Sequence, residues 1–167
     1  MLQSASTVRC AWCGTHIDEF AGISGPFGLC RKCLGEGFHT ALGNISAVND
    51  RFSDLLPFGF IRLDVNGIVL QYNTAESALS GLPPERVKGR NFFRSVAPCT
   101  CVDEFEGLTK RMVAVGLPAR ERIQFLFKLP GRSIMADIVV MYDPERKVIT
   151  LLVRKAPSSS PDMHHRS

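Results

Sequence analysis

The stretch Phe58–Tyr72, FGFIRLDVNGIVLQY, decides the fold. Two runs rich in apolar residues, Phe58–Asp64 and Ile68–Tyr72, stand on either side of Val65-Asn66-Gly67. Asn-Gly between two such runs is the strongest short signal for a β-hairpin. The sequence therefore predicts a pair of antiparallel strands at the start of a folded domain.

Downstream of the hairpin, glycines and prolines interrupt residues 73–101 and predict short helical turns and loops. Residues 102–115 have apolar side chains at near-helical spacing, which predicts one longer helix that ends at Gly116. Three further strands are expected, joined by Pro-Gly and Asp-Pro turns: Arg122–Leu129, Ser133–Tyr142 and Val148–Arg154. This order predicts an α+β domain over residues 56–155, with a five-stranded antiparallel sheet and helices on one face.

Two segments flank this domain. The apolar residues of Phe38–Leu55 recur every three or four positions, so an amphipathic connecting helix is expected over residues 37–55. Residues 156–167, APSSSPDMHHRS, are rich in Pro and Ser and have no periodicity, so we expect a disordered tail.

Residues 1–36 contain two C-x2-C pairs, Cys10 with Cys13 and Cys30 with Cys33, with sixteen residues between the pairs. Four thiolates suit tetrahedral Zn²⁺ and leave no open coordination position, which predicts a structural zinc module. A segment this short cannot build a sufficient core alone, so the metal would supply its folding energy. Two disulfides or an iron site of the rubredoxin kind are the alternatives.

Composition limits the classes of function. The 167 residues include 20 Lys and Arg against 16 Asp and Glu, and 45% are hydrophobic, which argues against a disordered or polybasic chain. The first 55 residues have four basic and five acidic side chains, which argues against nucleic acid as a partner and favours protein contact. The start of the chain lacks an apolar signal segment, and no apolar run reaches membrane-spanning length. We therefore expect a cytoplasmic protein without membrane contact.

The stretch from Leu56 to Lys155 resembles the photoactive yellow protein family, blue-light receptors of the PAS superfamily. The resemblance is densest at PFGFIRLDVNGIVLQYNTAESALSG, GRNFFRSVAPCT and DEFEG. It implies a PAS fold with 4-hydroxycinnamic acid attached to Cys99 by a thioester. It also implies that Tyr72 and Glu76 hydrogen-bond the phenolate, and that Ser80 stands where the family has a supporting threonine.

The same residues also have plain structural interpretations. Asn73 and Glu76 fit a helix N-cap with its capping-box partner, and Cys99 fits an inert buried thiol. The chain also departs from the family pattern. Leu82 stands where the family has an arginine, Leu129 stands where a tyrosine is usual, and Cys101 is an additional cysteine.

Two hypotheses of function follow. The first is a sensory blue-light receptor whose zinc module contacts a signalling partner or a second copy of the chain. The alternative is a chromophore-free PAS scaffold or adaptor for protein–protein interaction. An enzyme is not expected, because all four histidines lie outside residues 56–155 and leave Cys99 without a histidine base (His16, His39, His164 and His165).

Overall fold

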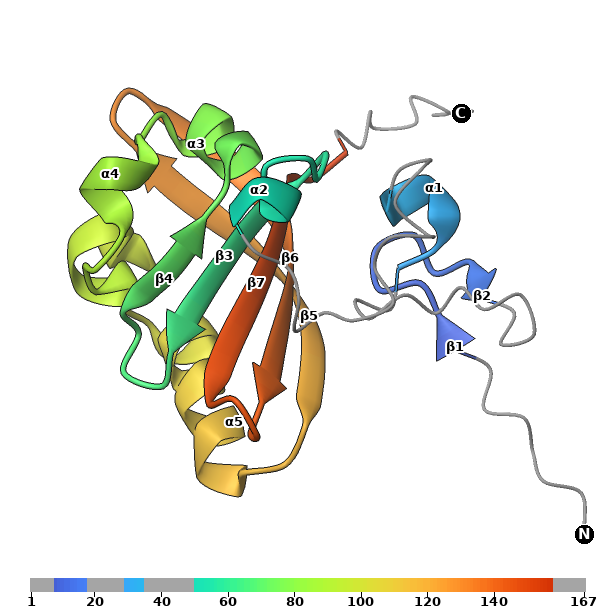
Figure 1. Cartoon of the computed structure of the whole chain (residues 1–167). Helices are drawn as coiled ribbons and strands as arrows, with labels where there is room; N and C mark the ends of the chain where they lie inside the picture. The colour runs from blue at the N-terminus through green and yellow to red at the C-terminus, as the bar shows by residue number, and fades with distance from the viewer. Residues whose placement is uncertain (1–7, 18–28, 35–49, 158–167) are drawn as a thin grey trace, which may run out of the picture.

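A computed structural model of the chain describes residues 8–17, 29–34 and 50–157 (Figure 1). The expected five-stranded antiparallel sheet with helices on one face is confirmed, with strand order β4-β3-β7-β6-β5. Its strands are β3 (Gly59–Asp64), β4 (Val69–Tyr72), β5 (Ala119–Leu129), β6 (Arg132–Asp143) and β7 (Val148–Lys155). The last three strands extend beyond their predicted bounds, and β5 begins at Ala119 because that residue already pairs with Tyr142 of β6.

The hairpin predicted from Asn-Gly joins β3 to β4. Asp64 Oδ1 accepts hydrogen bonds from the backbone N–H groups of Asn66, at 2.8 Å, and Ile68, at 2.9 Å. Gly67 has φ +84°, a conformation that glycine adopts without steric cost. A side chain at Gly67 would also meet the ring of Phe93 at 3.1 Å, so the turn packs closely onto the following helical turns.

The helical segments follow in the expected order. They are α3 (Thr74–Ser80), α4 (Pro84–Val87), the π turn η3 (Phe92–Val96), the 3₁₀ turn η4 (Pro98–Thr100), the π turn η5 (Asp103–Gly107) and α5 (Leu108–Val115). The predicted helix over residues 102–115 is confirmed as one helical segment, because η5 runs directly into α5. Only its first turn differs, since that turn is π-helical instead of α-helical. The wider turn of η5 places the fully buried ring of Phe105 among those of Phe92, Phe93, Phe125 and Phe127, and regular α-helix begins only after it.

Of the predicted connecting helix, the structure shows only α2 (Asp50–Ser53). Residues 37–49 lie outside the described residues, as do residues 158–167 of the predicted disordered tail. The helix ends at Ser53 instead of Leu55, because the chain turns tightly there and Pro57 follows. In this turn the Leu55 N–H donates to Phe52 O, and the Leu56 N–H donates to Ser53 O.

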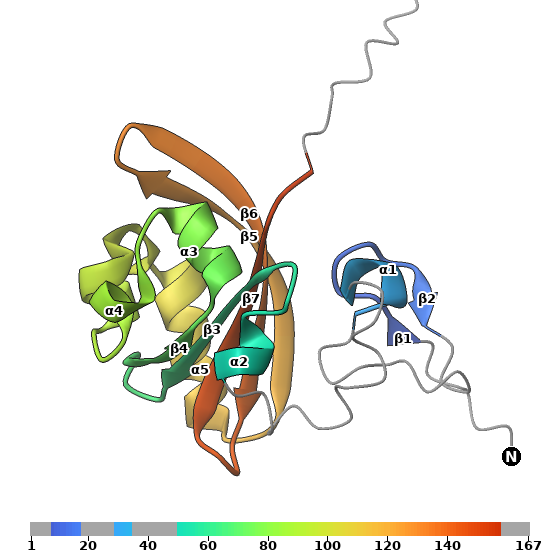
Figure 2. The same cartoon turned by 45° about the horizontal axis from the view of Figure 1, so that its top comes forward.

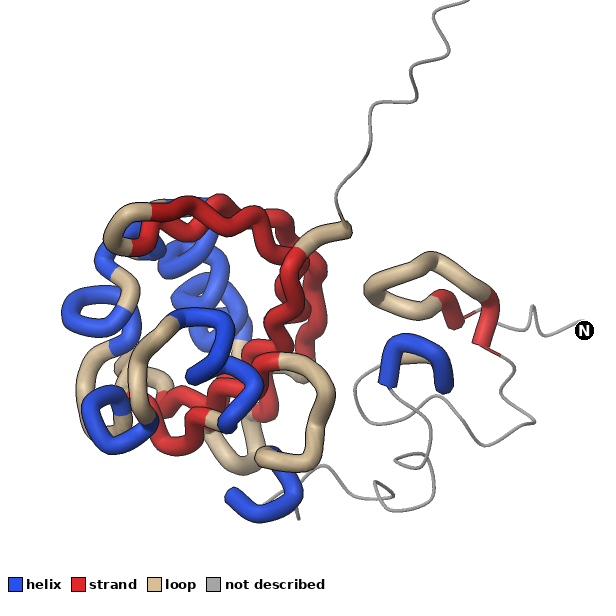
Figure 3. The backbone as a smooth tube through the Cα atoms, turned by 90° about the horizontal axis from the view of Figure 1, so that it is seen from above, coloured by secondary structure: helices blue, strands red, loops and turns tan. Residues whose placement is uncertain are grey.

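Apolar side chains cover both faces of the sheet. One cluster lies between the sheet and helices α3, α4 and α5, and includes Ile61, Val87, Met112, Ile138 and Leu151. A second cluster lies on the opposite face and includes Phe58, Phe60, Val139 and Leu152. Figures 2 and 3 show helices α3, α4 and α5 on one side of the sheet and the N-terminal cysteine segments on the other.

These N-terminal segments are the two-residue strands β1 (Val8–Arg9) and β2 (His16–Ile17) and the single turn α1 (Arg31–Leu34). The β1–β2 loop is tight, because Cys10 N–H bonds Thr15 O at 2.8 Å and Gly14 N–H bonds Cys10 O at 3.0 Å. Gly14 has φ +72°, which suits this position. We call these segments together the four-cysteine module.

No helix within the described ranges is long and apolar enough to cross a membrane.

Asn73, which is 0% exposed, joins α2, β3 and α3. Its Oδ1 accepts from the N–H groups of Phe60 and Glu76, at 2.8 and 3.0 Å, and its Nδ2 donates to the carbonyls of Ser53 and Phe58, at 2.7 and 2.9 Å. Asn73→Ala should lower the free energy of unfolding by about 3 kcal/mol or more, because each buried polar group left without a partner costs roughly 1–3 kcal/mol. Urea denaturation measures the loss.

The matched control is Asn91→Ala. Asn91 also accepts from a backbone N–H, that of Arg94, and donates to a carbonyl, that of Asn66, but at the protein surface. Water replaces these bonds, so the expected loss is about 1 kcal/mol or less. Equal losses in the two variants would contradict the central role of Asn73.

Candidate functional site

Asn73 places Glu76 at the start of α3. As the N-cap residue it accepts from Glu76 N–H through its side chain, which confirms the N-cap interpretation. The capping-box part of that interpretation is wrong, because Asn73 N–H donates to Phe60 O, at 3.1 Å, and not to the Glu76 carboxyl. The Glu76 side chain is therefore directed to another place.

The Glu76 carboxyl is buried in the core, with the residue 5% exposed. Its Oε2 has no hydrogen-bond partner among the described residues and packs directly against Gly59 of β3. Because burial penalises the charged form, the pKa of Glu76 is raised to about 8. Glu76 is therefore a protonated carboxylic acid at neutral pH, with a proton to donate.

Tyr72 and Ser80 lie beside Glu76. The Tyr72 hydroxyl and Ser80 Oγ are 2.6 Å apart. Burial, followed by the charge of Glu76, raises the pKa of Tyr72 above its ordinary value. Glu76 and Ser80 both line a cavity of about 20 Å³, together with Leu79, Phe127, Leu129 and Ile134. Three of the four residues expected at a chromophore, which are Tyr72 at the end of β4 and Glu76 and Ser80 of α3, thus lie together.

Cys99 lies on η4 and is partly buried. It packs against the same apolar cluster that contains Tyr72, and Leu82 and Leu129 pack there as well. The structure shows no hydrogen bond between Cys99 and Tyr72, Glu76 or Ser80 among the described residues. Cys101 is exposed and lies beside Glu106.

These residues fit a hydroxycinnamoyl group in kind. They offer a thiol to acylate, and a buried tyrosine hydroxyl, a partly buried serine hydroxyl and a protonated carboxyl as hydrogen-bond donors. The space beside the donors is about 20 Å³, far below the roughly 300 Å³ or more of ordinary ligand pockets. An aromatic acyl group therefore enters only if apolar side chains such as Leu129 and Ile134 move aside.

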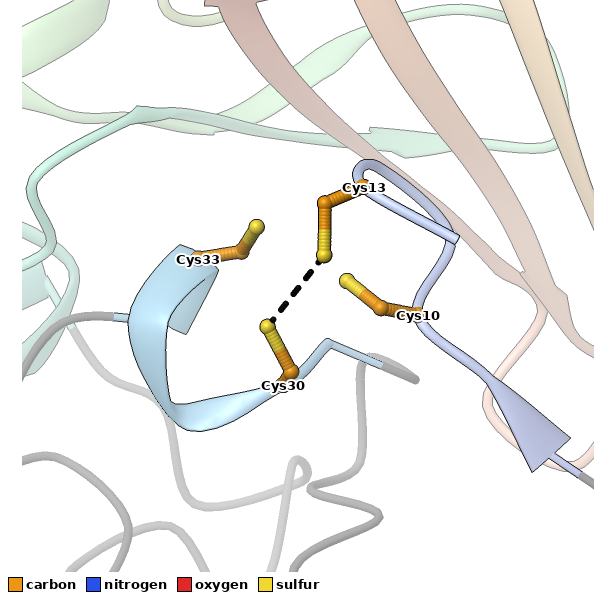
Figure 4. Close-up of side chains that lie close together, drawn as sticks. All are labelled: Cys10, Cys13, Cys30 and Cys33. Carbon is orange, nitrogen blue, oxygen red and sulfur yellow. Dashed lines mark hydrogen bonds between the residues drawn. The ribbon is translucent and has the colours of Figure 1, made fainter. Parts of the chain in front are cut away.

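The second site is the cysteine cluster of the four-cysteine module (Figure 4). The Sγ atoms of Cys10, Cys13, Cys30 and Cys33 all lie within 4.8 Å of one another and point toward a common centre. Cys13 Sγ and Cys30 Sγ are 3.5 Å apart, too far for a disulfide, and all four thiols are free. Four ligands at the usual Zn–S distance of about 2.3 Å would be about 3.8 Å apart, so the cluster matches a tetrahedral metal site.

The thiols of the cluster differ in acidity. A hydrogen bond with the Thr15 side chain lowers the pKa of Cys13 to about 6. Burial raises the pKa of Cys33 and that of Cys30. Cys13 is thus ready to bind a cation as a thiolate, and the others lose their protons when a metal binds.

Sequence reasoning missed the contacts that join the cluster to the sheet. Arg154 of β7 donates from Nη1 to Cys33 Sγ, at 4.0 Å, and from Nη2 to Trp12 O, at 3.3 Å. Arg154 and Cys33 are 121 positions apart, and no local motif connects them. The available signal was the nearly unbroken apolar run Val148–Val153, which is typical of a strand buried on both faces.

A family model described as the PAS fold matches residues 47–156, well over half of the chain. Photoactive yellow protein from Rhodobacter capsulatus is 30% identical over 115 residues, which cover 69% of this chain and 92% of that protein. Photoactive yellow protein from Halochromatium salexigens is 47% identical over 73 residues, or 44% of this chain. In that alignment the chain spans 58% of the relative's length.

Solved structures agree with these matches. The photoactive yellow protein domain of the sensor histidine kinase Ppr from Rhodospirillum centenum aligns with a TM-score of 0.63 at 36% identity, covering 68% of this chain and 98% of that domain. The PAS domain of a Desulfitobacterium hafniense protein aligns with a TM-score of 0.51 at 15% identity over 63% of this chain and 98% of that one, and shares the fold. The PAS match begins after the four-cysteine module. From residue 47 onward, the chain belongs to the photoactive yellow protein family of PAS-fold sensory domains.

Proposed function

We propose that this chain is a blue-light receptor that carries 4-hydroxycinnamic acid on Cys99 and a structural zinc ion in its four-cysteine module. The observation that carries the proposal is the buried Glu76 carboxyl beside the paired hydroxyls of Tyr72 and Ser80. Its Oε2 has no hydrogen-bond partner in the part of the chain that the structure describes. A buried donor without an acceptor is costly, and a phenolate at this place would supply the acceptor.

Each residue has a distinct role in the proposal. The Cys99 sulfur attacks the carbonyl carbon of an activated hydroxycinnamoyl ester or thioester, the leaving group departs, and the thiol proton goes to solvent. Tyr72 and Glu76 donate hydrogen bonds to the phenolate, and Ser80 positions the Tyr72 hydroxyl. The bound group supplies absorption of blue light and an isomerisation that moves its negative charge. Glu76 can then pass the proton on its carboxyl to the phenolate oxygen, which leaves a buried carboxylate whose charge favours local opening.

The zinc assignment rests on the donor set. Four thiolates around one centre suit Zn²⁺, and they leave no position open for a substrate. The described parts of the module contribute a few buried residues and very short strands and helix, so the metal would supply much of the energy that holds them together. The zinc is therefore proposed as structural.

A second candidate is a PAS scaffold without chromophore. The closed packing beside Glu76, with about 20 Å³ of free space, favours this function, as does Leu82 in the place of the family's arginine. In this version the domain would act by binding a protein partner, and Cys99 would be a structural or redox-active thiol.

In both versions the protein is proposed to be non-catalytic. Residues 56–155 contain no histidine that could activate Cys99 as an enzyme nucleophile. We propose that the signal passes to a signalling protein or to a second copy of the chain. The proposed location is the cytoplasm, and neither nucleic acid nor a membrane is a proposed partner.

The buried carboxyl predicts a specific dependence on pH. The pKa of Glu76 is about 8 in the folded chain against an ordinary 4.5, so between these values the unfolded chain has lost a proton that the folded chain still holds. Stability should therefore fall as pH rises through this window, by up to about 1.4 kcal/mol per pH unit from this group. Glu76→Gln should remove that slope, as measured by urea denaturation of the chromophore-free protein from pH 5 to pH 8. An unchanged slope would contradict the burial of an acid here.

Chromophore attachment is tested with the pure protein and an activated 4-hydroxycinnamic acid. The wild type should form a yellow adduct whose blue absorption band bleaches in light, with a mass increase of one hydroxycinnamoyl group. Cys99→Ser should abolish the adduct, whereas Cys101→Ser, two positions away and exposed, should retain it. If the wild type gains no such band, the scaffold function replaces the receptor.

Metal analysis should find one zinc ion per chain. Cys30→Ser removes one of the four converging thiolates and should release the zinc and lower the thermal stability of the module. Cys101→Ser, whose thiol lies outside the cluster, should keep the zinc. A Cys30→Ser protein with zinc bound as tightly as in the wild type would rule out the four-thiolate site.

A further inference from the structure

The four-cysteine module packs against the face of the sheet opposite the helices (Figure 3). Cys10, Trp12 and Leu29 of the module form one buried cluster with sheet residues, including Phe60, Val139 and Leu152. Trp12 is 3% exposed, and its ring lies edge-on to that of Phe58, with the centroids 4.9 Å apart. The module therefore covers the part of the outer face that Phe60, Val139 and Leu152 occupy.

Arg154 of β7 makes polar contacts between the two parts. Its guanidinium lies 4.8 Å from the centre of the Trp12 ring. The same group donates to the Trp12 carbonyl and to the Cys33 sulfur. A guanidinium has five N–H donors in a planar fork, so it can hold a ring, a carbonyl and a sulfur at once, which a lysine cannot.

Asp137 of β6 holds Arg154 in place from the sheet side. It is 0% exposed, and its Oδ2 lies 3.2 Å from Arg154 Nη2. Its Oδ1 accepts from Arg122, at 3.2 Å, and from Gln124, at 2.9 Å. Burial alone would raise the pKa of Asp137, but the bonds from Gln124 and Arg122 outweigh this and keep it low. The carboxylate therefore stays charged and orients Arg154 toward the module.

The contact with Cys33 matters once a metal is bound. Four thiolates around one Zn²⁺ have a net charge of −2, and N–H donors to the sulfurs stabilise this excess of negative charge. Such outer groups orient metal ligands, and their loss typically costs 10–100-fold in metal affinity. Arg154 is a donor of this kind, supplied by the PAS sheet and not by the module.

We propose that Arg154 is a positioning residue that couples metal binding by the four-cysteine module to the covering of the outer face of the sheet. The proposal rests on the zinc site of the proposed function. Because Arg154 contacts the module only where the module meets the sheet, metal binding and docking stabilise each other by the same amount. Loss of the metal weakens the docking and uncovers the apolar patch of Phe58, Phe60, Val139 and Leu152.

The test compares Arg154→Gln with Arg122→Gln in the full chain. Both arginines pair with Asp137 from the outer face, but only Arg154 contacts Trp12 and Cys33. Zinc affinity is measured by competition with a chromogenic chelator. Arg154→Gln should bind one zinc about 10–100-fold more weakly than the wild type, and Arg122→Gln should bind it as tightly as the wild type. Equal affinities in all three proteins would overturn the proposal.

Two spectroscopic signals separate coupling from a general loss of stability. Cobalt(II) in place of zinc gives thiolate charge-transfer bands, which should shift in Arg154→Gln and not in Arg122→Gln. Trp12 is the only tryptophan, so its emission reports on docking. Removing zinc from the wild type with a chelator should shift this emission to the red as the ring leaves its buried site. Unchanged emission would overturn the coupling.

Arg154→Lys keeps the positive charge that balances Asp137. It replaces Arg154→Gln in the zinc-affinity measurement if Arg154→Gln does not fold. It should still lose zinc affinity, because an ammonium cannot replace the fork of donors. Zinc affinity equal to that of the wild type would overturn the role of Arg154. A wild type that binds no zinc would instead reject the metal site of the proposed function, so the two failures are distinguishable.

Discussion

The two apolar faces of the sheet are the constraint on which the rest of the structure depends. In β7 and the middle of β6, buried side chains follow one another without the alternation that marks a sheet with one face in water. Both faces must therefore be covered, because apolar surface left in water costs free energy in proportion to its area. Helices α3, α4 and α5 cover one face, and the four-cysteine module covers the part of the other that Phe60, Val139 and Leu152 occupy.

The two candidate sites lie on opposite sides of strand β3. Glu76 packs on Gly59 from the helical side, and the neighbouring residues Phe58 and Phe60 belong to the cluster that holds the module on the outer side. Gly59 also pairs with Val153, the residue before Arg154. A side chain at Gly59 would collide with the Glu76 carboxyl, so glycine is what allows the acid to lie so close to the strand. The proposed light-sensing donor and the proposed metal module are thus separated by one layer of backbone.

Local sequence patterns predicted most of the fold, because the backbone preferences of neighbouring residues determine where turns form and where helices end. Asn66-Gly67 predicted the hairpin, and the turn residues between the later strands predicted their connections correctly. Periodicity also predicted the helical segment that ends at Val115, but it did not predict the π geometry of the first turn. Residues 102–107 have helical spacing, yet the burial of Phe105 among four other phenylalanines is reached through a π turn. Gly116 ends α5 as predicted, since its left-handed conformation is a local property.

By itself the sequence determined the α+β architecture and the arrangement of four cysteines in two C-x2-C units, because turns, periodicity and ligand spacing are local. The candidate residues around Cys99 were implied by the resemblance to a known family and not by these local patterns. Only the tertiary structure decided that the Asn73 side chain bonds four backbone groups and that Arg154 links Asp137 to Trp12 and Cys33. It also decided that Glu76 is buried with an Oε2 that no described residue bonds. Apart from the bond between Asn73 and Glu76, these contacts join residues far apart in the chain. Their energies therefore depend on burial and geometry that exist only after the sheet has formed and both of its faces are packed.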